Sequence, residues 1–356
     1  MAELLRRWRY PALVAALFLV LLIFVLARQA RSPRQPSSVP RAALSLFWRP
    51  MVMGFYENQG TGPGTSWASL VAHARQIQIT SPYWYRINAS GNLTHDMAVS
   101  QVTKFAHGHR SFVWPLIGNS GKDPMYSAST RSRMITTIES LVRRHGYDGV
   151  LIDFELLTPY SRDDLSTFLN DLGRTLHREG KGLGVAVFPK VGISQDVSFP
   201  YDYPALGKVT DAVVIMAYDH HYQGGPAGPI APLPWVRNNV NFALGHVPSQ
   251  RIYLGVAAYG YDWTGSGQSN PITTLHAQAL LTKYGITPTW DAVSQEYHFR
   301  YVDGGQSHNI WYEDQRSFAQ KLALAKAARL GGIALWELGG ESPDIWTQLK
   351  HTSLLS

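Results

Sequence analysis

The sequence predicts an α/β protein: a (β/α)8 TIM barrel with a small α+β insertion between strand 7 and helix 7, preceded by an N-terminal transmembrane helix. Three observations lead to this fold class. Strand-like apolar runs alternate with helical patterns eight times over about 300 residues, the count expected for such a barrel. Polar or aromatic residues close several of these runs. One interval between a strand and its helix is too long for a bare loop.

The N-terminal region predicts a membrane segment. Residues 11–27 form an uninterrupted apolar stretch with arginines on both sides. A helix of this length spans about 25 Å, within the accepted range, and Trp8 would lie at the membrane interface. We expect an uncleaved signal anchor over 11–27, a basic cytoplasmic N-terminus over 1–10 and a disordered linker over 28–48, which leaves the following domain extracytoplasmic, at the cell envelope or in a spore. A cleaved signal peptide is the alternative.

Residues 49–352 contain the predicted barrel. Its eight strands are expected at Val52–Tyr56, Gln76–Ser81, Ser111–Ile117, Val150–Glu155, Leu183–Phe188, Ala212–Tyr218, Ile252–Ala257 and Gly332–Trp336. Helical patterns follow them at Ser66–Arg75, Val99–His107, Thr130–His145, Arg162–Arg178, Tyr203–Gly207, Pro234–Leu244, Asp314–Leu330 and Asp344–Leu349. Because catalytic groups of such barrels lie at the carboxyl ends of the strands, residues at these ends are the candidates for a site.

The long interval lies between the seventh strand and the helix that starts near Asp314. It contains the strand-like runs Tyr297–Val302 and Ile310–Tyr312. An inserted α+β lobe over 263–312 therefore fits better than an unstructured loop.

Composition excludes several classes of protein. The chain has no cysteine, so disulfides, thiolate metal sites and a cysteine nucleophile are excluded. Its net charge of +7 suits an anionic surface or polymer. Much of this charge lies near the N-terminus, and no nucleic-acid motif follows, so we expect no nucleic-acid partner. Aromatic residues make up 12% of the chain and suit a carbohydrate cleft, although most aromatic side chains fill cores.

Two carboxylates lie two residues apart at the end of the fourth predicted strand. The apolar run 150–152 predicts a buried strand, and because strand side chains alternate between faces, Asp153 and Glu155 point the same way. Like charges this close cannot both ionise freely, so one carboxyl should keep a proton near neutral pH, as a general acid requires. A solvated polar strand end is the alternative for an isolated pair. Tyr218 and Asp219 close the sixth predicted strand and Trp336 closes the eighth, and their presence at the same end of the barrel favours a catalytic site.

These motifs resemble those of a known family. Residues 148–155, Asp-Gly-Val-Leu-Ile-Asp-Phe-Glu, resemble the fourth-strand signature D-G-x-[DN]-x-D-x-E of glycoside hydrolase family 18. Residues 216–219, Met-Ala-Tyr-Asp, resemble its M-x-Y-D signature, and Trp336 looks like its floor tryptophan. A closer likeness, to bacterial spore-germination and cortex-lytic N-acetylglucosaminidases, is carried by residues 219–232, 259–263 and 311–314.

The resemblance implies a retaining, substrate-assisted hydrolysis of β-1,4 N-acetylglucosamine linkages in peptidoglycan or chitin-like glycans. Glu155 would be the general acid, and Asp153 would hold the substrate's 2-acetamido N–H. Tyr218 would donate to the acetamido oxygen, which attacks the anomeric carbon. Asp219 would bind a sugar hydroxyl or tune the carboxylates, and Trp336 would form the floor beneath the sugar. No metal or organic cofactor is needed, and we expect a monomer.

Four further aromatic residues near strand ends are expected to contact substrate: Tyr56, Trp114, Tyr261 and Trp263. Leu151 departs from the family pattern, which has Asp or Asn there, and leucine can neither donate nor accept a hydrogen bond. We therefore expect an altered pH dependence. A catalytically weak or inactive glycan-binding protein on the same fold is the alternative function.

Overall fold

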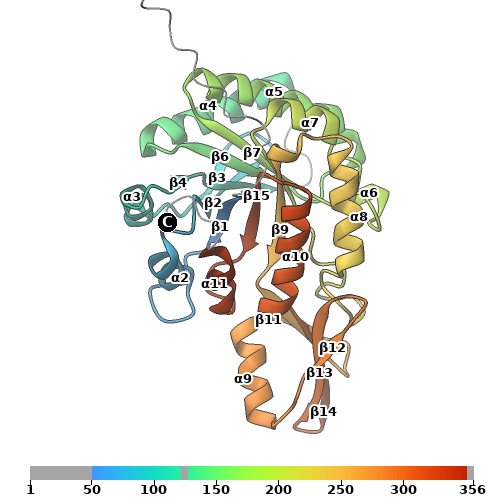
Figure 1. Cartoon of the computed structure of the whole chain (residues 1–356). Coiled ribbons are helices and arrows are strands. Elements are labelled where there is room, and N and C mark those ends of the chain that lie inside the picture. Colours follow the sequence, from blue (N-terminus) through green and yellow to red (C-terminus); the bar gives the residue numbers. More distant parts are fainter. Residues whose placement is uncertain (1–49, 122–126, 351–356) are drawn as a thin grey trace, which may run out of the picture. The chain divides into compact units, whose positions relative to one another are not determined.

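The computed structural model describes residues 50–121 and 127–350 (Figure 1). The predicted signal anchor 11–27, the basic N-terminus 1–10 and the linker 28–48 all lie outside these residues. Within the described ranges, no helix combines the length and apolar character needed to cross a membrane.

Eight parallel strands close into a barrel, which confirms the (β/α)8 barrel of the predicted fold. Each strand pairs with the next, and the last returns to the first. In barrel order the strands are β1 (Met51–Tyr56), β2 (Ile79–Asn88), β5 (Leu116–Ser120), β6 (Gly149–Asp153), β7 (Gly182–Val187), β8 (Ala212–Ile215), β9 (Ile252–Ala257) and β15 (Gly332–Trp336). Two short strands, β3 (Leu93–Asp96) and β4 (Phe112–Val113), pair with β2.

Helices follow the barrel strands as the sequence pattern predicts. They are α2 (Ser66–His73), α3 (Ser100–Gly108), α4 (Ala128–His145), α5 (Arg162–Arg178), α7 (Tyr203–Val209), α8 (Leu233–Leu244), α10 (Gln315–Ala327) and α11 (Asp344–Lys350). Shorter turns are η1 (Pro159–Ser161), α6 (Gln195–Ser198) and η2 (Ser249–Arg251). The start of α10 is set by a capping box, in which the Asp314 side chain accepts from the Ser317 backbone N–H.

Two strands differ from the sequence prediction, and both differences move aromatic residues. β2 runs to Asn88 instead of Ser81, so Tyr83, Trp84 and Tyr85 lie within the strand and not after it. The predicted third strand is two strands, β4 and β5, and β5 extends to Ser120. Trp114 consequently lies before β5, far from the carboxyl end of the barrel strand.

The barrel interior is packed with apolar side chains, and Trp114 is among them. Its ring lies where β6 and β7 begin, because a β-carbon built on Gly182 would come within 2.1 Å of the ring and one on Gly149 within 2.8 Å. The two glycines face each other across the β6–β7 pair. Trp114 therefore fills the amino-terminal end of the barrel, the end opposite the expected site.

The insertion between β9 and α10 is a lobe with its own sheet. Its elements are β10 (Tyr259–Thr264), β11 (Ser269–Thr273), α9 (Thr274–Tyr284), β12 (Thr289–Asp291), β13 (Glu296–Asp303) and β14 (Gln306–Tyr312). The antiparallel strand order is β11-β10-β14-β13-β12. Apolar side chains of α9 pack against Phe299 and Ile310 on one face of this sheet. The lobe begins at Tyr259, not at 263 as predicted, because β10 follows β9 almost directly.

A buried ion cluster joins the lobe to the barrel. Lys321 of α10 bonds Glu313 and lies 3.9 Å from Glu296 of β13, and all three side chains are almost fully buried. Glu296 also accepts hydrogen bonds from the backbone N–H groups of Ile230 and Ala231, at 2.8 and 2.7 Å. The cluster thus holds the loop after β8 against the lobe.

Replacing Lys321 with methionine should destabilise the protein strongly. The change leaves two carboxylates buried without their cation, which costs about 3–5 kcal/mol of unfolding free energy. Urea denaturation of the full chain measures this loss. The matched control is Lys326→Met on the exposed side of the same helix, which should change stability little. Equal stability of the two variants would contradict the structural role of the cluster.

Candidate active site

Two adjoining cavities open at the carboxyl ends of the barrel strands. The inner one, about 130 Å³, is lined by Tyr218 and Asp219. The outer one, about 390 Å³, is lined by Tyr83 and Arg86. Asp153, Glu155 and Trp336 line both. The structure therefore brings the predicted catalytic residues and two of the predicted substrate-binding residues to one hollow.

The two carboxylates reach this hollow because the residue between them is held in the opposite direction. Phe154 is buried, and its backbone carbonyl accepts a hydrogen bond of 2.7 Å from the Tyr201 hydroxyl. The side chain of Asn119, at the end of β5, accepts from the Glu155 backbone N–H at 2.8 Å and donates to the Glu155 carbonyl at 2.9 Å. Both neighbouring segments thus fix the direction of Asp153 and Glu155.

Tyr218 and Asp219 come from the segment after β8. The Tyr218 ring packs on Gly255 of β9, where an added β-carbon would lie 3.0 Å from the ring. Asp219 has a φ of 57° and accepts hydrogen bonds from the hydroxyls of Tyr259, at 2.5 Å, and Tyr261, at 3.0 Å. The first lobe strand therefore holds Asp219 toward the barrel.

Trp336 ends β15 and lies between two aromatic residues. Its ring meets Phe55 edge-on at 5.1 Å between centroids and tilts toward Tyr83 at 6.5 Å. Half-buried and exposed to both cavities, it offers an apolar surface on which a pyranose ring can stack.

Burial raises the pKa of every acidic group at the site. The pKa of Asp153 is raised well above its ordinary value by burial and by the charge of Glu155. The pKa of Glu155 is raised by burial and by the charge of Asp219. The Arg86 guanidinium opposes both shifts. Asp153 Oδ1 is shielded from solvent and has no hydrogen-bond partner among the described residues. A substrate N–H could therefore bind there.

Burial in the same cavity also shifts the pKa values of Tyr218 and Asp219. Burial and the charge of Asp153 raise the Tyr218 pKa, so its hydroxyl remains a hydrogen-bond donor at neutral pH. Burial also raises the pKa of Asp219, while the hydrogen bonds from Tyr259 and Tyr261 lower it. The site thus offers a proton donor, a fixed phenol and at least one carboxylate around one cavity.

Sequence reasoning missed Arg86 and Asn119. Arg86 lies on β2 beyond the predicted end of that strand, with its guanidinium 5.2 Å from the centre of the Tyr83 ring. Asn119 likewise lies beyond the predicted end of the third strand. Had β2 and β5 been predicted at their full lengths, both residues would have been placed at the carboxyl end of the barrel. The continuation of the run Leu116–Ser120 past Ile117 was the sequence signal for Asn119.

The four aromatic side chains predicted to contact substrate do not line the catalytic cavities. Tyr56 is buried and alternates with Phe55, which takes the inward position. Trp114 fills the opposite end of the barrel. Tyr261 is buried, and its hydroxyl donates a hydrogen bond to Asp219. Trp263 lines a different cavity, on the lobe, and its Nε1 donates to the Gly225 carbonyl at 3.0 Å.

Asp153→Asn should stabilise the protein at neutral pH. Because the folded-state pKa of Asp153 is raised, the unfolded chain releases this proton above about 3.8 while the folded chain still holds it. Stability therefore falls as pH rises through that window, and the amide removes the loss. Melting temperatures across pH 3 to 8 should show a gain that disappears at the acid end. The exposed Asp171→Asn serves as control, and a lower melting temperature for Asp153→Asn at pH 7 would contradict this account.

The chain is similar in sequence to known proteins. A family model described as glycosyl hydrolases family 18 matches residues 52–341. The cortical fragment-lytic enzyme of Bacillus subtilis (strain 168) is 32% identical over 238 residues, which are 65% of this chain and 55% of that protein. The chain therefore spans about half the length of this relative. The glycosylase YvbX of the same organism, described as uncharacterized, is 27% identical over 307 residues, 82% of this chain and 89% of that protein.

Solved structures show the same similarity. The spore cortex-lytic enzyme SleL of Bacillus cereus superposes with a TM-score of 0.79 at 25% identity, covering 86% of this chain and 76% of that one. A chitinase from Chromobacterium violaceum ATCC 12472 superposes with a TM-score of 0.78 at 28% identity, covering 85% and 98%.

Proposed function

Because this chain belongs to glycosyl hydrolase family 18, we propose that it hydrolyses β-1,4 N-acetylglucosamine linkages, in peptidoglycan of a spore cortex or cell wall or in chitin-like glycans. One observation carries the proposal: Asp153, Glu155 and Tyr218, from two strands, meet at a single cavity floored by Trp336. The names of the relatives include both a cortical fragment-lytic enzyme and a chitinase. The closer likeness to cortex-lytic enzymes, carried by residues 219–232, 259–263 and 311–314, favours peptidoglycan.

The proposed reaction is retaining and uses the substrate's own acetamido group. Glu155, protonated because its pKa is raised, donates its proton to the glycosidic oxygen. The acetamido carbonyl oxygen attacks the anomeric carbon as the bond to the leaving group breaks, forming an oxazolinium ion. Glu155, now ionised, then takes a proton from water, which attacks the same carbon and reopens the ring.

The remaining residues orient and stabilise this intermediate. Asp153 Oδ1, which has no partner in the described parts of the chain, would accept from the acetamido N–H and offset its developing positive charge. The Tyr218 hydroxyl would donate to the acetamido oxygen and fix its direction of attack. Asp219, held by two tyrosines, would accept from a sugar hydroxyl.

Leu151 lies beneath Asp153 and has no polar group to share. It is fully buried and packs so closely on β7 that a β-carbon on Gly184 would lie 2.7 Å from it. Asp153 therefore has no hydrogen-bonding partner on that side. The same feature favours the second candidate function, a glycan-binding protein with weak or absent turnover.

We also propose that the protein acts outside the cytoplasm, tethered by residues 11–27. The apolar run supports the membrane tether. Arginines lie on both sides of it and do not fix the orientation, so the location outside the cytoplasm rests on the proposed cell-wall substrate.

Glu155→Gln should abolish hydrolysis and preserve binding. The amide cannot transfer a proton, so release of reducing ends from peptidoglycan fragments and N-acetylglucosamine oligomers should fall about 100-fold or more. Glu139→Gln, on the outer helix α4, is the control and should keep full activity. Unchanged release by Glu155→Gln would remove this residue from its role. Binding without release by the unmutated protein would favour the glycan-binding function.

Arg86→Gln should displace the pH–rate profile to higher pH. Arg86 lowers the pKa of both Asp153 and Glu155, so its loss raises both, and each limb of the profile follows. Initial rates from pH 4 to 9 measure the shift. Arg86→Lys keeps the charge and should hold the profile near its original position. A profile that moves to lower pH in Arg86→Gln would refute the assigned electrostatics.

A further inference from the structure

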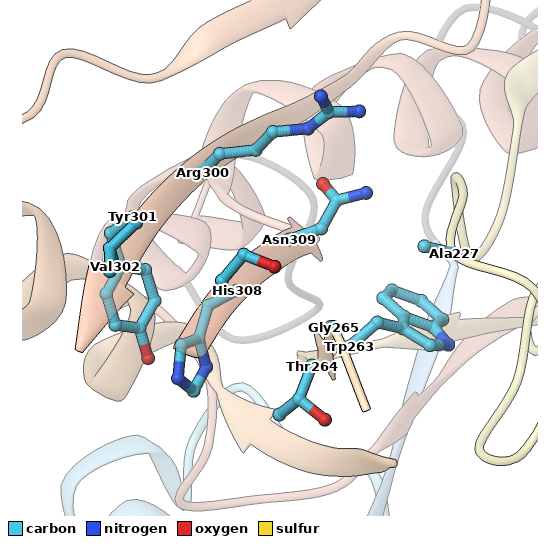
Figure 2. A pocket seen from close by; sticks show the side chains of 10 residues that line it. Ala227, Trp263, Thr264, Gly265, Arg300, Tyr301, Val302, His308 and Asn309 are labelled. Carbon is cyan, nitrogen blue, oxygen red and sulfur yellow. The ribbon is translucent and has the colours of Figure 1, made fainter. Parts of the chain in front are cut away.

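A third cavity, about 480 Å³, lies on the lobe and includes none of the catalytic residues (Figure 2). Its lining includes Trp263 of β10, Arg300 of β13, Asn309 of β14 and Ala227 of the loop after β8. We infer that this cavity binds a carboxylate group carried by the glycan whose cleavage is proposed above. The inference rests on that proposed function and adds to it a recognition site for an acidic substituent.

Strand register gathers the polar groups on one face of the lobe sheet. Trp263 pairs with Asn309 across β10 and β14, and Asn309 pairs with Arg300 across β14 and β13, so the three side chains form a row. Figure 2 shows Arg300 and Asn309 projecting away from the side on which Tyr301 and His308 lie. The opposite face is occupied, because Phe299 and Ile310 pack in the lobe core with α9.

Two of the three groups in this row, Arg300 and Asn309, are free to bind a ligand. Arg300 is exposed, and no carboxylate of the described residues lies within ion-pair distance of it. Asn309 Oδ1 is shielded from solvent, yet no hydrogen-bond partner for it occurs in residues 50–121 or 127–350. On the other face, by contrast, Tyr301 and His308 already bond Asp262, at 3.0 and 2.8 Å.

The chemistry of the row selects the ligand. A guanidinium binds a carboxylate through two parallel hydrogen bonds, which a neutral hydroxyl cannot reproduce. The buried Asn309 oxygen can accept a hydrogen bond from an adjacent hydroxyl or amide N–H. The row therefore suits an acidic group on an otherwise hydroxyl-rich and amide-rich chain, and a neutral N-acetylglucosamine polymer carries no such group.

Side-chain contacts along β10 link residues of the inner catalytic cavity to residues of the lobe cavity. Tyr261 donates to Asp219, which lines the inner catalytic cavity, and its ring contacts that of Trp263 at 5.4 Å between centroids. Residues two apart on a strand are separated by about 7 Å. The row with Arg300 therefore lies on the lobe sheet whose strand β10 also contacts Asp219, and a glycan that extends from the catalytic cavity over this sheet would meet it.

Two sources could supply the carboxylate in peptidoglycan: the lactyl ether on a sugar, or a peptide attached to it. Binding to the full chain carrying Glu155→Gln, which prevents turnover, is measured by calorimetry with three ligands. These are neutral N-acetylglucosamine oligomers, glycan strands with free lactyl groups, and strands that retain their peptides. The comparison is repeated after adding Arg300→Gln, or Arg237→Gln on the exposed side of α8 as matched control.

Arg300→Gln should weaken binding of a carboxylate-bearing strand about tenfold and leave the neutral oligomer unchanged. A loss with peptide-free strands assigns the lactyl group, and a loss confined to peptide-bearing strands assigns the peptide. Equal weakening of all three ligands, or of none, would overturn the inference. The proposed function fails separately: if the unmutated protein releases no reducing ends, hydrolysis is refuted while the effect of Arg300 on binding can still be read.

Discussion

The site depends on holding two acidic side chains in one enclosed hollow at the end of β6. Burial and mutual repulsion disfavour their ionised forms, and Asp153 Oδ1 lacks a partner among the described residues. The chain keeps them there by fixing the backbone on either side. The Tyr201 hydroxyl holds the Phe154 carbonyl, and the Asn119 amide holds both backbone groups of Glu155. Hydrogen bonds from neighbouring segments thus keep the two acidic side chains in an unfavourable, buried position.

The lobe is part of that frame. Its first strand places two tyrosine hydroxyls on Asp219, and its β13 supplies Glu296, which binds two backbone N–H groups of the loop after β8. That loop and the segment bearing Tyr218 and Asp219 are continuous. The insertion therefore fixes the position of groups that belong, by sequence, to the barrel.

Much of the fold could be predicted because eight apolar runs alternate with amphipathic helices, and D-x-E at a strand end gave the acidic pair. The positions of the aromatic side chains relative to the site could not be predicted from the sequence. In segment 79–88, Pro82 interrupts the apolar pattern and favours a strand end at Ser81, so Arg86 was missed and the length of β2 was underestimated. Trp114 was misplaced because the third apolar run was interpreted as one strand that ends at Ile117, whereas β4 and β5 are separate and β5 runs to Ser120. The roles of Asn119 and Tyr261 depend on partners distant in sequence, which periodicity does not reveal.

Trp114, seated against Gly149 and Gly182, closes the barrel at the end remote from Glu155. Packed side chains fill the space between. Everything that enters or leaves the reaction centre must therefore use the same mouth. In the mechanism proposed here, the severed glycan fragment occupies the approach that the hydrolytic water needs. Departure of that fragment would have to precede hydration of the intermediate, so the architecture itself imposes an order on the two halves of the catalytic cycle.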